Sequence, residues 1–404
     1  MVGSNAKVAT GIFFEDFMGS LRFILALLVV GSHLGAFGGA TFAVKAFFII
    51  SGFYMTLVID TRYHKLSVWS FYASRLLRLL PLYWVVGALT LIAECLLVPP
   101  GQMMSKMASP IFYASSLDLG SLPIPILIYA GVSDTTMFGL DTGQWLGFNR
   151  FSGELSLAPD FGPDAMSVMA ISPVPQGWSV GLELLFYLIA PFIVRRSLWF
   201  LASLCALSLA LRIVLMAAGF FGDPWNRTLF ASELVYFLLG VLAYRLYLQL
   251  PRFNFSPRME LGLAAMVLGV AIIYWPIDHV IRGSLIWETV PYILVAVGMP
   301  FLFRLTKNIS LDANIGELSY PIYMVHNLVI GLILWSPLNT APFVGTGRPR
   351  YVLTIALVIA AAFLLDRLVA LPIDRLRVRF GAQKRIEDQR PGARTWAYQM
   401  IRRM

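Results

Sequence analysis

The chain has 404 residues, of which 58% are hydrophobic and only 13% are charged. A soluble domain of this length needs more charge on its surface, so the composition excludes an ordinary soluble protein and favours one that is embedded in lipid. The net charge of +9 gathers on one predicted side of the membrane, which argues against nucleic-acid binding. The two cysteines, Cys95 and Cys205, exclude a disulfide framework and indicate no metal site.

Apolar runs close to the length of about 20 residues that crosses a bilayer recur along the chain. They predict an all-α integral membrane protein with about ten transmembrane helices. The predicted spans are 17–36, 41–59, 79–98, 177–194, 198–219, 229–247, 260–277, 288–305, 318–336 and 351–372. Residues 1–16 are then an N-terminal segment, residues 17–372 the transmembrane domain and residues 373–404 a basic tail.

Basic residues are unevenly divided between the two sets of loops. If the N-terminus is cytoplasmic, the cytoplasmic loops and the tail hold most of the arginines and lysines, as the positive-inside rule requires. Both termini are therefore predicted to be cytoplasmic. The long connection 99–176 then lies outside the cell membrane, and its apolar stretch from Leu122 to Tyr129 could re-enter the membrane or cover a cavity.

Arg22 and His33 are the first ionisable pair inside a predicted span. Eleven helical residues make about three turns, so both side chains lie on one face, about 16 Å apart. An imidazole can take a proton from a hydroxyl or carry an acyl group, and a guanidinium suits a phosphate. A buried histidine bonded to a carbonyl is the plain structural alternative for His33 alone, but the pair together favours function.

Arg75 and Arg78 are three residues apart, on one face of a short helix predicted just before the third span. Tyr83 follows them and suits a membrane interface. Arginines beside a span are ordinary topology signals. Because Arg22 also lies toward the cytoplasm, however, the three guanidinium groups could hold a polyphosphate such as that of coenzyme A.

Glu183 is placed about 9 Å into the bilayer if the fourth span begins near Trp178. His33 is expected at a similar depth, so a carboxylate–imidazole contact could fix the tautomer of His33. His326, behind Tyr323, could line the cavity, bind substrate or make a structural hydrogen bond. Lys45 could pair with Glu183, contact a phosphate or reach the interface.

These residues together resemble the acyltransferase-3 family of membrane O-acyltransferases. Its first-helix signature, an arginine, ten residues and a histidine, matches Arg22 to His33. The other blocks that match are Phe47 to Phe53 with Ser51, the paired arginines with Pro81 and Tyr83, Trp178-Ser179 with Glu183, Phe186, Tyr187 and Pro191, and Gly316 to His326 with Ser319, Tyr320 and Tyr323. Five blocks in order are jointly specific, although each alone is weak.

The resemblance implies an enzyme that transfers an acyl group, acetyl by preference, from cytoplasmic acyl-coenzyme A to a hydroxyl of an extracytoplasmic or lipid-linked carbohydrate. It implies that His33 is the catalytic base or a transient acyl carrier assisted by Glu183, and that Arg22, Arg75 and Arg78 hold the coenzyme. The residues expected at the substrate or cavity are Lys45, Ser51, Tyr83, Trp178, Ser179, Tyr323 and His326. It further implies a multi-pass protein of the bacterial inner membrane, without a metal, that works beside glycan-assembly machinery.

A proton-coupled secondary transporter of a glycan, lipid or organic anion is the main alternative, because buried His, Glu and Lys would suit proton coupling. The chain shows no repeated halves, and the paired arginines have no obvious role in transport. A catalytically inert assembly or sensor protein is a third interpretation, which leaves the spacing of Arg22 and His33 unexplained.

Overall fold

The computed structural model describes residues 18–61, 63, 67–97, 123–149, 152, 154–157, 165–220, 222–225, 227–281, 287–335 and 347–377. The predicted N-terminal segment 1–16 and most of the predicted tail 373–404 lie outside these residues, as does Leu122.

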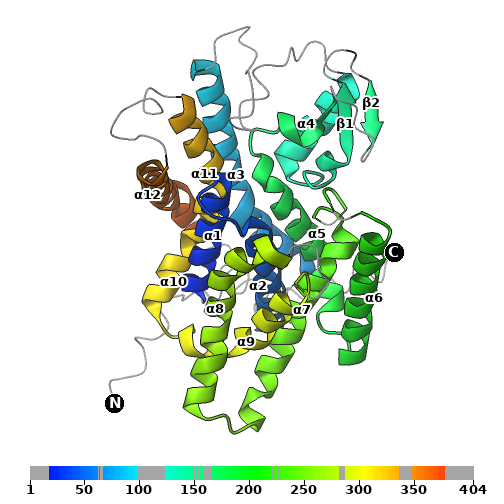
Figure 1. Cartoon of the computed structure of the whole chain (residues 1–404), viewed down its shortest axis with the longest axis vertical. Helices are drawn as coiled ribbons and strands as arrows, with labels where there is room; N and C mark the ends of the chain where they lie inside the picture. Colours follow the sequence, from blue (N-terminus) through cyan, green and yellow to red (C-terminus); the bar gives the residue numbers. More distant parts are fainter. Residues whose placement is uncertain are drawn as a thin grey trace, which may run out of the picture.

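Helices make up most of the described chain (Figure 1). They are α1 (Gly19–His33), α2 (Ala40–Thr61), α3 (Val68–Leu97), α4 (Ile124–Thr136), α5 (Trp178–Ile193), α6 (Leu198–Ala217), α7 (Phe230–Gln249), α8 (Pro257–Ile281), α9 (Val290–Thr306), α10 (Ser310–Glu317), α11 (Ser319–Trp335) and α12 (Arg348–Leu365). A π-helical stretch, η9 (Asp366–Ala370), continues α12, and the short 3₁₀ turns are η4 (Thr142–Gln144), η5 (Val168–Ile171), η6 (Pro175–Gly177) and η7 (Leu250–Arg252).

The predicted class is confirmed. Within the described residues, eight helical segments are long and apolar enough to cross a membrane, and α1 and α9 are shorter apolar helices. Each predicted span overlaps one of these segments or shorter helices. The protein is therefore an all-α integral membrane protein that crosses the membrane several times. The number of crossings and the side on which the termini lie stay predictions.

Helix α2 lies at the centre of the bundle and is buried along almost its whole length. It packs closely along α7 because each helix presents a glycine to the other's backbone. A Cβ atom on Gly52 would lie 1.9 Å from the carbonyl oxygen of Phe237, and one on Gly240 would lie 1.9 Å from that of Ile49. Such small-residue contacts let membrane helices approach, since apolar side chains gain little by leaving lipid for protein. This contact holds α2, with Lys45 and Ser51, in a fixed position.

The first turn of α1 is held by α10. Asp312 accepts hydrogen bonds from the backbone N–H groups of Gly19 at 2.7 Å and Ser20 at 2.8 Å, and from the Ser20 hydroxyl at 2.6 Å. A helix leaves its first N–H groups without internal partners, and a carboxylate there also interacts favourably with the helix dipole. The contact therefore sets the position of α1, which carries Arg22 and His33.

The third span differs from its prediction at its beginning. The sequence predicts a short helix before a span that starts at residue 79, whereas α3 is continuous from Val68 and includes Arg75, Arg78 and Pro81. Proline normally interrupts a helix in water, but in a membrane bundle neighbouring groups can satisfy the backbone that it frees. Arg75 and Arg78 therefore share one rigid helix with the rest of the span.

The long connection 99–176 carries structure of its own, which the sequence did not predict. Strands β1 (Leu146–Asn149), β2 (Leu155–Leu157) and β3 (Ala165–Ser167) form an antiparallel sheet in the order β2-β1-β3, beside α4 at one end of the molecule (Figure 1). A small separate cluster of Ile126, Phe148, Val168 and Ile171 packs α4 against η5 and the sheet. We call the described part of residues 124–177 the cap; it leads directly into α5.

Two side chains of α3 attach the cap to the bundle. The Tyr83 hydroxyl donates to Asp134 at 3.0 Å, and the Trp84 indole donates to the carbonyl of Thr135 at 2.8 Å. Ser172 also donates to Asp134, at 2.5 Å. Asp134 therefore joins α3, α4 and the segment before α5, and it fixes where α5 starts.

Candidate active site

Two adjoining cavities lie inside the bundle. We call the first the arginine cavity, because Arg22, Arg75 and Arg78 line it; its empty volume is about 810 Å³, counting the open mouth. The second, the histidine cavity, is lined by His33 and measures about 760 Å³ on the same basis. Val44 and Tyr323 line both cavities, so the two meet at these side chains.

The arginine cavity is suited to an anion. Among its lining residues three guanidinium groups stand against one carboxylate, that of Glu183. Arg75 is buried and its guanidinium lies over the ring of Phe71, 5.8 Å from the centroid. Partly buried guanidinium groups that converge from α1 and α3 bind planar or polyanionic groups well, because their donors are fixed and local water screening is weak.

The histidine cavity is lined by groups that suit a ligand with hydroxyls. The Asn327 amide donates to the side-chain oxygen of Gln176 at 2.8 Å, and the Gln176 amide donates to the backbone of α11. The guanidinium of Arg227 lies over the Trp178 ring, 4.8 Å from its centroid. His33 is exposed to this cavity at the end of α1. Amides, an aromatic face and an imidazole give both hydrogen-bond donors and acceptors to a bound molecule.

Tyr323 forms the boundary between the cavities. Its hydroxyl lies 2.6 Å from the Ser179 hydroxyl and donates to the carbonyl of Gln176 at 3.1 Å. These bonds tie α11 to the first turn of α5 and hold the ring in place. Helix α1 runs past this boundary with Arg22 lining one cavity and His33 the other, about 16 Å apart along the helix.

The structure does not bring Glu183 to His33. Glu183 lies in the arginine cavity, where its carboxylate accepts hydrogen bonds from Ser51 at 2.6 Å and from Tyr187. A contact between Glu183 and His33 requires α5 to start near the membrane surface. Instead, η6 just before α5 already contacts the first half of α11 through Gln176. Glu183, further along α5, therefore lies beyond the Tyr323 boundary, in the arginine cavity.

The other predicted site residues divide between the two cavities. Ser51 and Ser179 line the arginine cavity, whereas Lys45 and Trp178 line the histidine cavity. Tyr83 lines neither of them and is bonded to Asp134 in the cap. His326 is fully buried beside His33, with ring centroids 5.0 Å apart.

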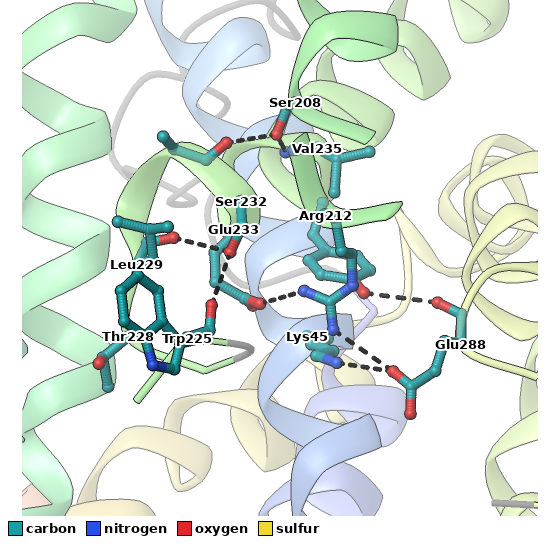
Figure 2. Close-up of polar contacts among 12 residues, drawn as sticks. Lys45, Ser208, Arg212, Trp225, Thr228, Leu229, Ser232, Glu233, Val235 and Glu288 are labelled. Carbon is teal, nitrogen blue, oxygen red and sulfur yellow. Dashed lines mark hydrogen bonds and ion pairs between the residues drawn. The ribbon is translucent and has the colours of Figure 1, made fainter. Parts of the chain in front are cut away.

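Lys45 belongs to a buried charge network that sequence reasoning missed (Figure 2). Its ammonium lies 3.1 Å from Glu288, which also meets Arg212 at 3.4 Å; Arg212 in turn lies 2.7 Å from Glu233. In Figure 2 Arg212 points between the two carboxylates. Two positive and two negative charges leave this network neutral, which is how ionisable groups are tolerated inside a membrane protein.

Glu233 also lines the histidine cavity. It lies near the start of the predicted span 229–247, where an ionisable side chain is costly, so the sequence alone could have singled it out. The sequence does not indicate that Glu288 pairs with Lys45 and Arg212. Glu233 and Glu288 belong to different elements, and only the packing of these elements brings both carboxylates to Arg212. Within the described residues, no group of three or more His, Cys, Asp or Glu side chains is placed to hold a metal ion.

Comparison with known proteins identifies the class of enzyme. The profile of the family described as "Acyltransferase domain" matches residues 16–367. The chain therefore belongs to the acyltransferase-3 family and is a membrane acyltransferase. It is also similar to the "Exopolysaccharide production protein ExoZ" of Rhizobium meliloti (strain 1021), with 23% identity over 354 residues, which are 85% of this chain and 91% of that protein. No solved structure is significantly similar.

Proposed function

We propose that this protein transfers an acetyl group from acetyl-coenzyme A to a hydroxyl of an exopolysaccharide or of its lipid-linked precursor. The observation that carries the proposal is the meeting of two cavities at Val44 and Tyr323, one lined by three arginines and the other by His33. An acyltransferase must bring a donor and an acceptor together at one reacting centre. A cavity on each side of the boundary at Val44 and Tyr323 allows the two substrates to enter separately.

In this proposal the arginine cavity binds the donor. Arg22, Arg75 and Arg78 hold the phosphates of coenzyme A on the cytoplasmic side. The pantetheine arm then extends along α1 past Tyr323. Arg22 and His33 are about 16 Å apart along this helix. This is comparable with the length of an extended pantetheine arm. The thioester would thus reach His33 while the charged end of the donor stays among the arginines.

The histidine cavity receives the acceptor from the other side of the membrane. Gln176, Trp178 and Asn327 present amides and an indole face, which are common partners of sugar hydroxyls and rings. The similar protein ExoZ is named for exopolysaccharide production, which favours a carbohydrate acceptor. We accordingly place the enzyme in a bacterial inner membrane, beside the machinery that assembles or exports the glycan.

His33 acts as the general base. It takes the proton of the acceptor hydroxyl as the oxygen attacks the thioester carbonyl, so that a carbon–oxygen bond forms and the carbon–sulfur bond breaks. The proton then passes from His33 to the departing thiolate, and His33 returns to its neutral form. The net reaction consumes no proton. Glu183 helps to shape the donor cavity through Ser51 and Tyr187.

The test uses radiolabelled acetyl-coenzyme A with purified protein in nanodiscs, supplied with exopolysaccharide or lipid-linked oligosaccharide. Wild type should transfer label, and His33→Ala should lose transfer while still binding coenzyme A. Arg75→Ala or Arg78→Ala should weaken that binding about 10- to 100-fold, since a charge-assisted hydrogen bond contributes about 1.5–3 kcal/mol. Arg304→Ala, on α9 and outside the arginine cavity, is the matched control. Unchanged binding in both α3 variants, or full transfer by His33→Ala, would contradict the proposal.

A further inference from the structure

His326 lies directly behind His33 as seen from the histidine cavity. The ring centroids are 5.0 Å apart and the ring planes are inclined by 52°. His33 lines the cavity, whereas His326 is fully buried in α11 and is not among the lining residues. A molecule in the cavity can therefore touch His33 but not His326. This arrangement is typical of a residue that acts through another one.

The surroundings of His326 determine which ring nitrogen carries its proton. The Nδ1 atom lies 2.7 Å from the carbonyl oxygen of Tyr323. A carbonyl oxygen can only accept, so Nδ1 carries the hydrogen and donates it. In the neutral ring Nε2 then holds a lone pair. That Nε2 atom is buried and has no hydrogen-bond partner within the described residues. Leaving a buried acceptor unpaired costs about 1–3 kcal/mol, so a donor is expected beside it.

His33 is the side chain best placed to supply that donor. An N–H···N bond between two imidazoles separates the ring centres by about 5 Å, the sum of a hydrogen bond of about 2.9 Å and two ring radii. The observed 5.0 Å matches this separation. The other polar neighbours are engaged: the Tyr323 hydroxyl with Ser179 and the Asn327 amide with Gln176. His33 is exposed at the end of α1, so its ring can turn a nitrogen toward Nε2 of His326.

We propose that His326 is a positioning residue that accepts an N–H hydrogen bond from His33 and so selects the tautomer of the catalytic base. With one nitrogen of His33 donating to His326, the other nitrogen has a free lone pair that faces the cavity. This proposal rests on the role of His33 in the proposed function. The neutral imidazole of His326, and not the carboxylate of Glu183 as the sequence suggested, then fixes the tautomer of His33. It also leaves His33 neutral before reaction, as a base must be.

The first measurement is the tautomer of His33 by ¹⁵N NMR of protein labelled only at histidine. The chain contains four histidines, so single replacements can assign every signal. In wild type we expect His33 to show one protonated and one unprotonated nitrogen, the protonated one hydrogen-bonded. In His326→Phe, which keeps a ring but has no acceptor, we expect a mixture of both tautomers. An unchanged His33 spectrum in His326→Phe would overturn the proposal.

The second measurement is the rate of acetyl transfer. His326→Phe should lower kcat about 100-fold, at the low end of the contribution of a correctly placed general base, and leave KM for acetyl-coenzyme A unchanged. His326→Gln, whose amide oxygen can accept from His33, should recover part of the loss. Thr354→Val is the matched control, because Thr354 is equally buried, lies on the adjacent α12 and donates to the carbonyl of Arg350 in its own helix. It should leave kcat unchanged.

A pH profile separates positioning from a loss of packing. Lys45, Arg227 and Glu233 also line the histidine cavity and are retained in every variant, so they contribute equally to each profile. The acid limb of kcat should move in His326→Phe and return toward wild type in His326→Gln. Equal kcat losses in both variants, with an unmoved limb, would overturn the proposal. If wild type transfers no acetyl group, the proposed function fails, while the NMR spectra still decide whether His326 positions His33.

Discussion

Replacing Arg212 by methionine removes the partner of a carboxylate that has almost no access to water. Arg212 Nη1 lies 2.7 Å from Glu233, and each side chain is 1% exposed. Breaking a buried ion pair by removing one partner costs about 3–5 kcal/mol, because Lys45 alone cannot balance two buried carboxylates. We therefore expect Arg212→Met to lower the free energy of unfolding by about 3–5 kcal/mol.

Glu233→Gln should have a smaller effect than Arg212→Met. Arg212 keeps its contact with Glu288, 3.4 Å away, when Glu233 is neutralised. The double variant removes both charges of the pair, so it should be more stable than the sum of the single effects predicts. The difference is the coupling energy, expected at about 2–3 kcal/mol. Reversible unfolding in SDS-containing mixed micelles, followed by the fluorescence of the ten tryptophans, measures all four proteins.

A more exposed pair of nearly the same length provides the control. Arg304 Nη1 lies 2.8 Å from Glu260, but the Arg304 side chain is 44% exposed. Exposed ion pairs contribute about 0–1 kcal/mol, so Arg304→Met should change stability by no more than that. If Arg212→Met were no more destabilising than Arg304→Met, or if the changes at Arg212 and Glu233 were simply additive, the buried pair would not carry this energy.

Three further outcomes follow from the structure. Gly52→Ala should lower the free energy of unfolding by about 1–3 kcal/mol in the micelle assay, because its Cβ would meet the Phe237 carbonyl at 1.9 Å. Gly269→Ala is the control: the space around its Cβ is open, so the change should be neutral or stabilising by up to about 1 kcal/mol. Burial raises the pKa of Asp141 from 3.8 to about 6, which favours the neutral acid in the folded cap. This contribution, up to about 3 kcal/mol, is complete below pH 3.8 and is lost as the pH rises through 6. Asp141→Asn should accordingly flatten the dependence of the thermal midpoint on pH between these values, and an unchanged slope would contradict the assignment. Tyr83→Phe should accelerate hydrogen exchange in Ile124–Thr136 about 10-fold, since it removes one bond of about 1–1.5 kcal/mol to Asp134; equal exchange would show that Tyr83 does not hold the cap.

The secondary structure was predictable for the segments that cross the lipid. Apolar runs of spanning length gave the helices of the bundle, because lipid requires every backbone group to bond within its own helix. The short strands of the cap have no such constraint. Their pairing joins β1 to β2 and to β3 across a connection with many turn residues, and no local pattern of the sequence marks it.

The charged residues inside the spans were also predictable as a group. Placing an ionisable side chain in a membrane is costly, so Arg22, His33, Lys45 and Arg212 stand out from the sequence alone. Their partners do not stand out. Lys45 meets Glu288 and not Glu183, because partner choice depends on where α2, α6 and α9 pack.

The sequence by itself determined that this protein is a helical membrane acyltransferase with Arg22 and His33 on one helix, since hydropathy, charge and helical spacing are local properties. Only the tertiary structure decided how those residues are shared between two cavities. The depth at which α5 starts depends on its contacts with α11 and the cap, which are distant in sequence. The starting position of α5 places Glu183 in the arginine cavity. His326, on α11, lies beside His33 instead.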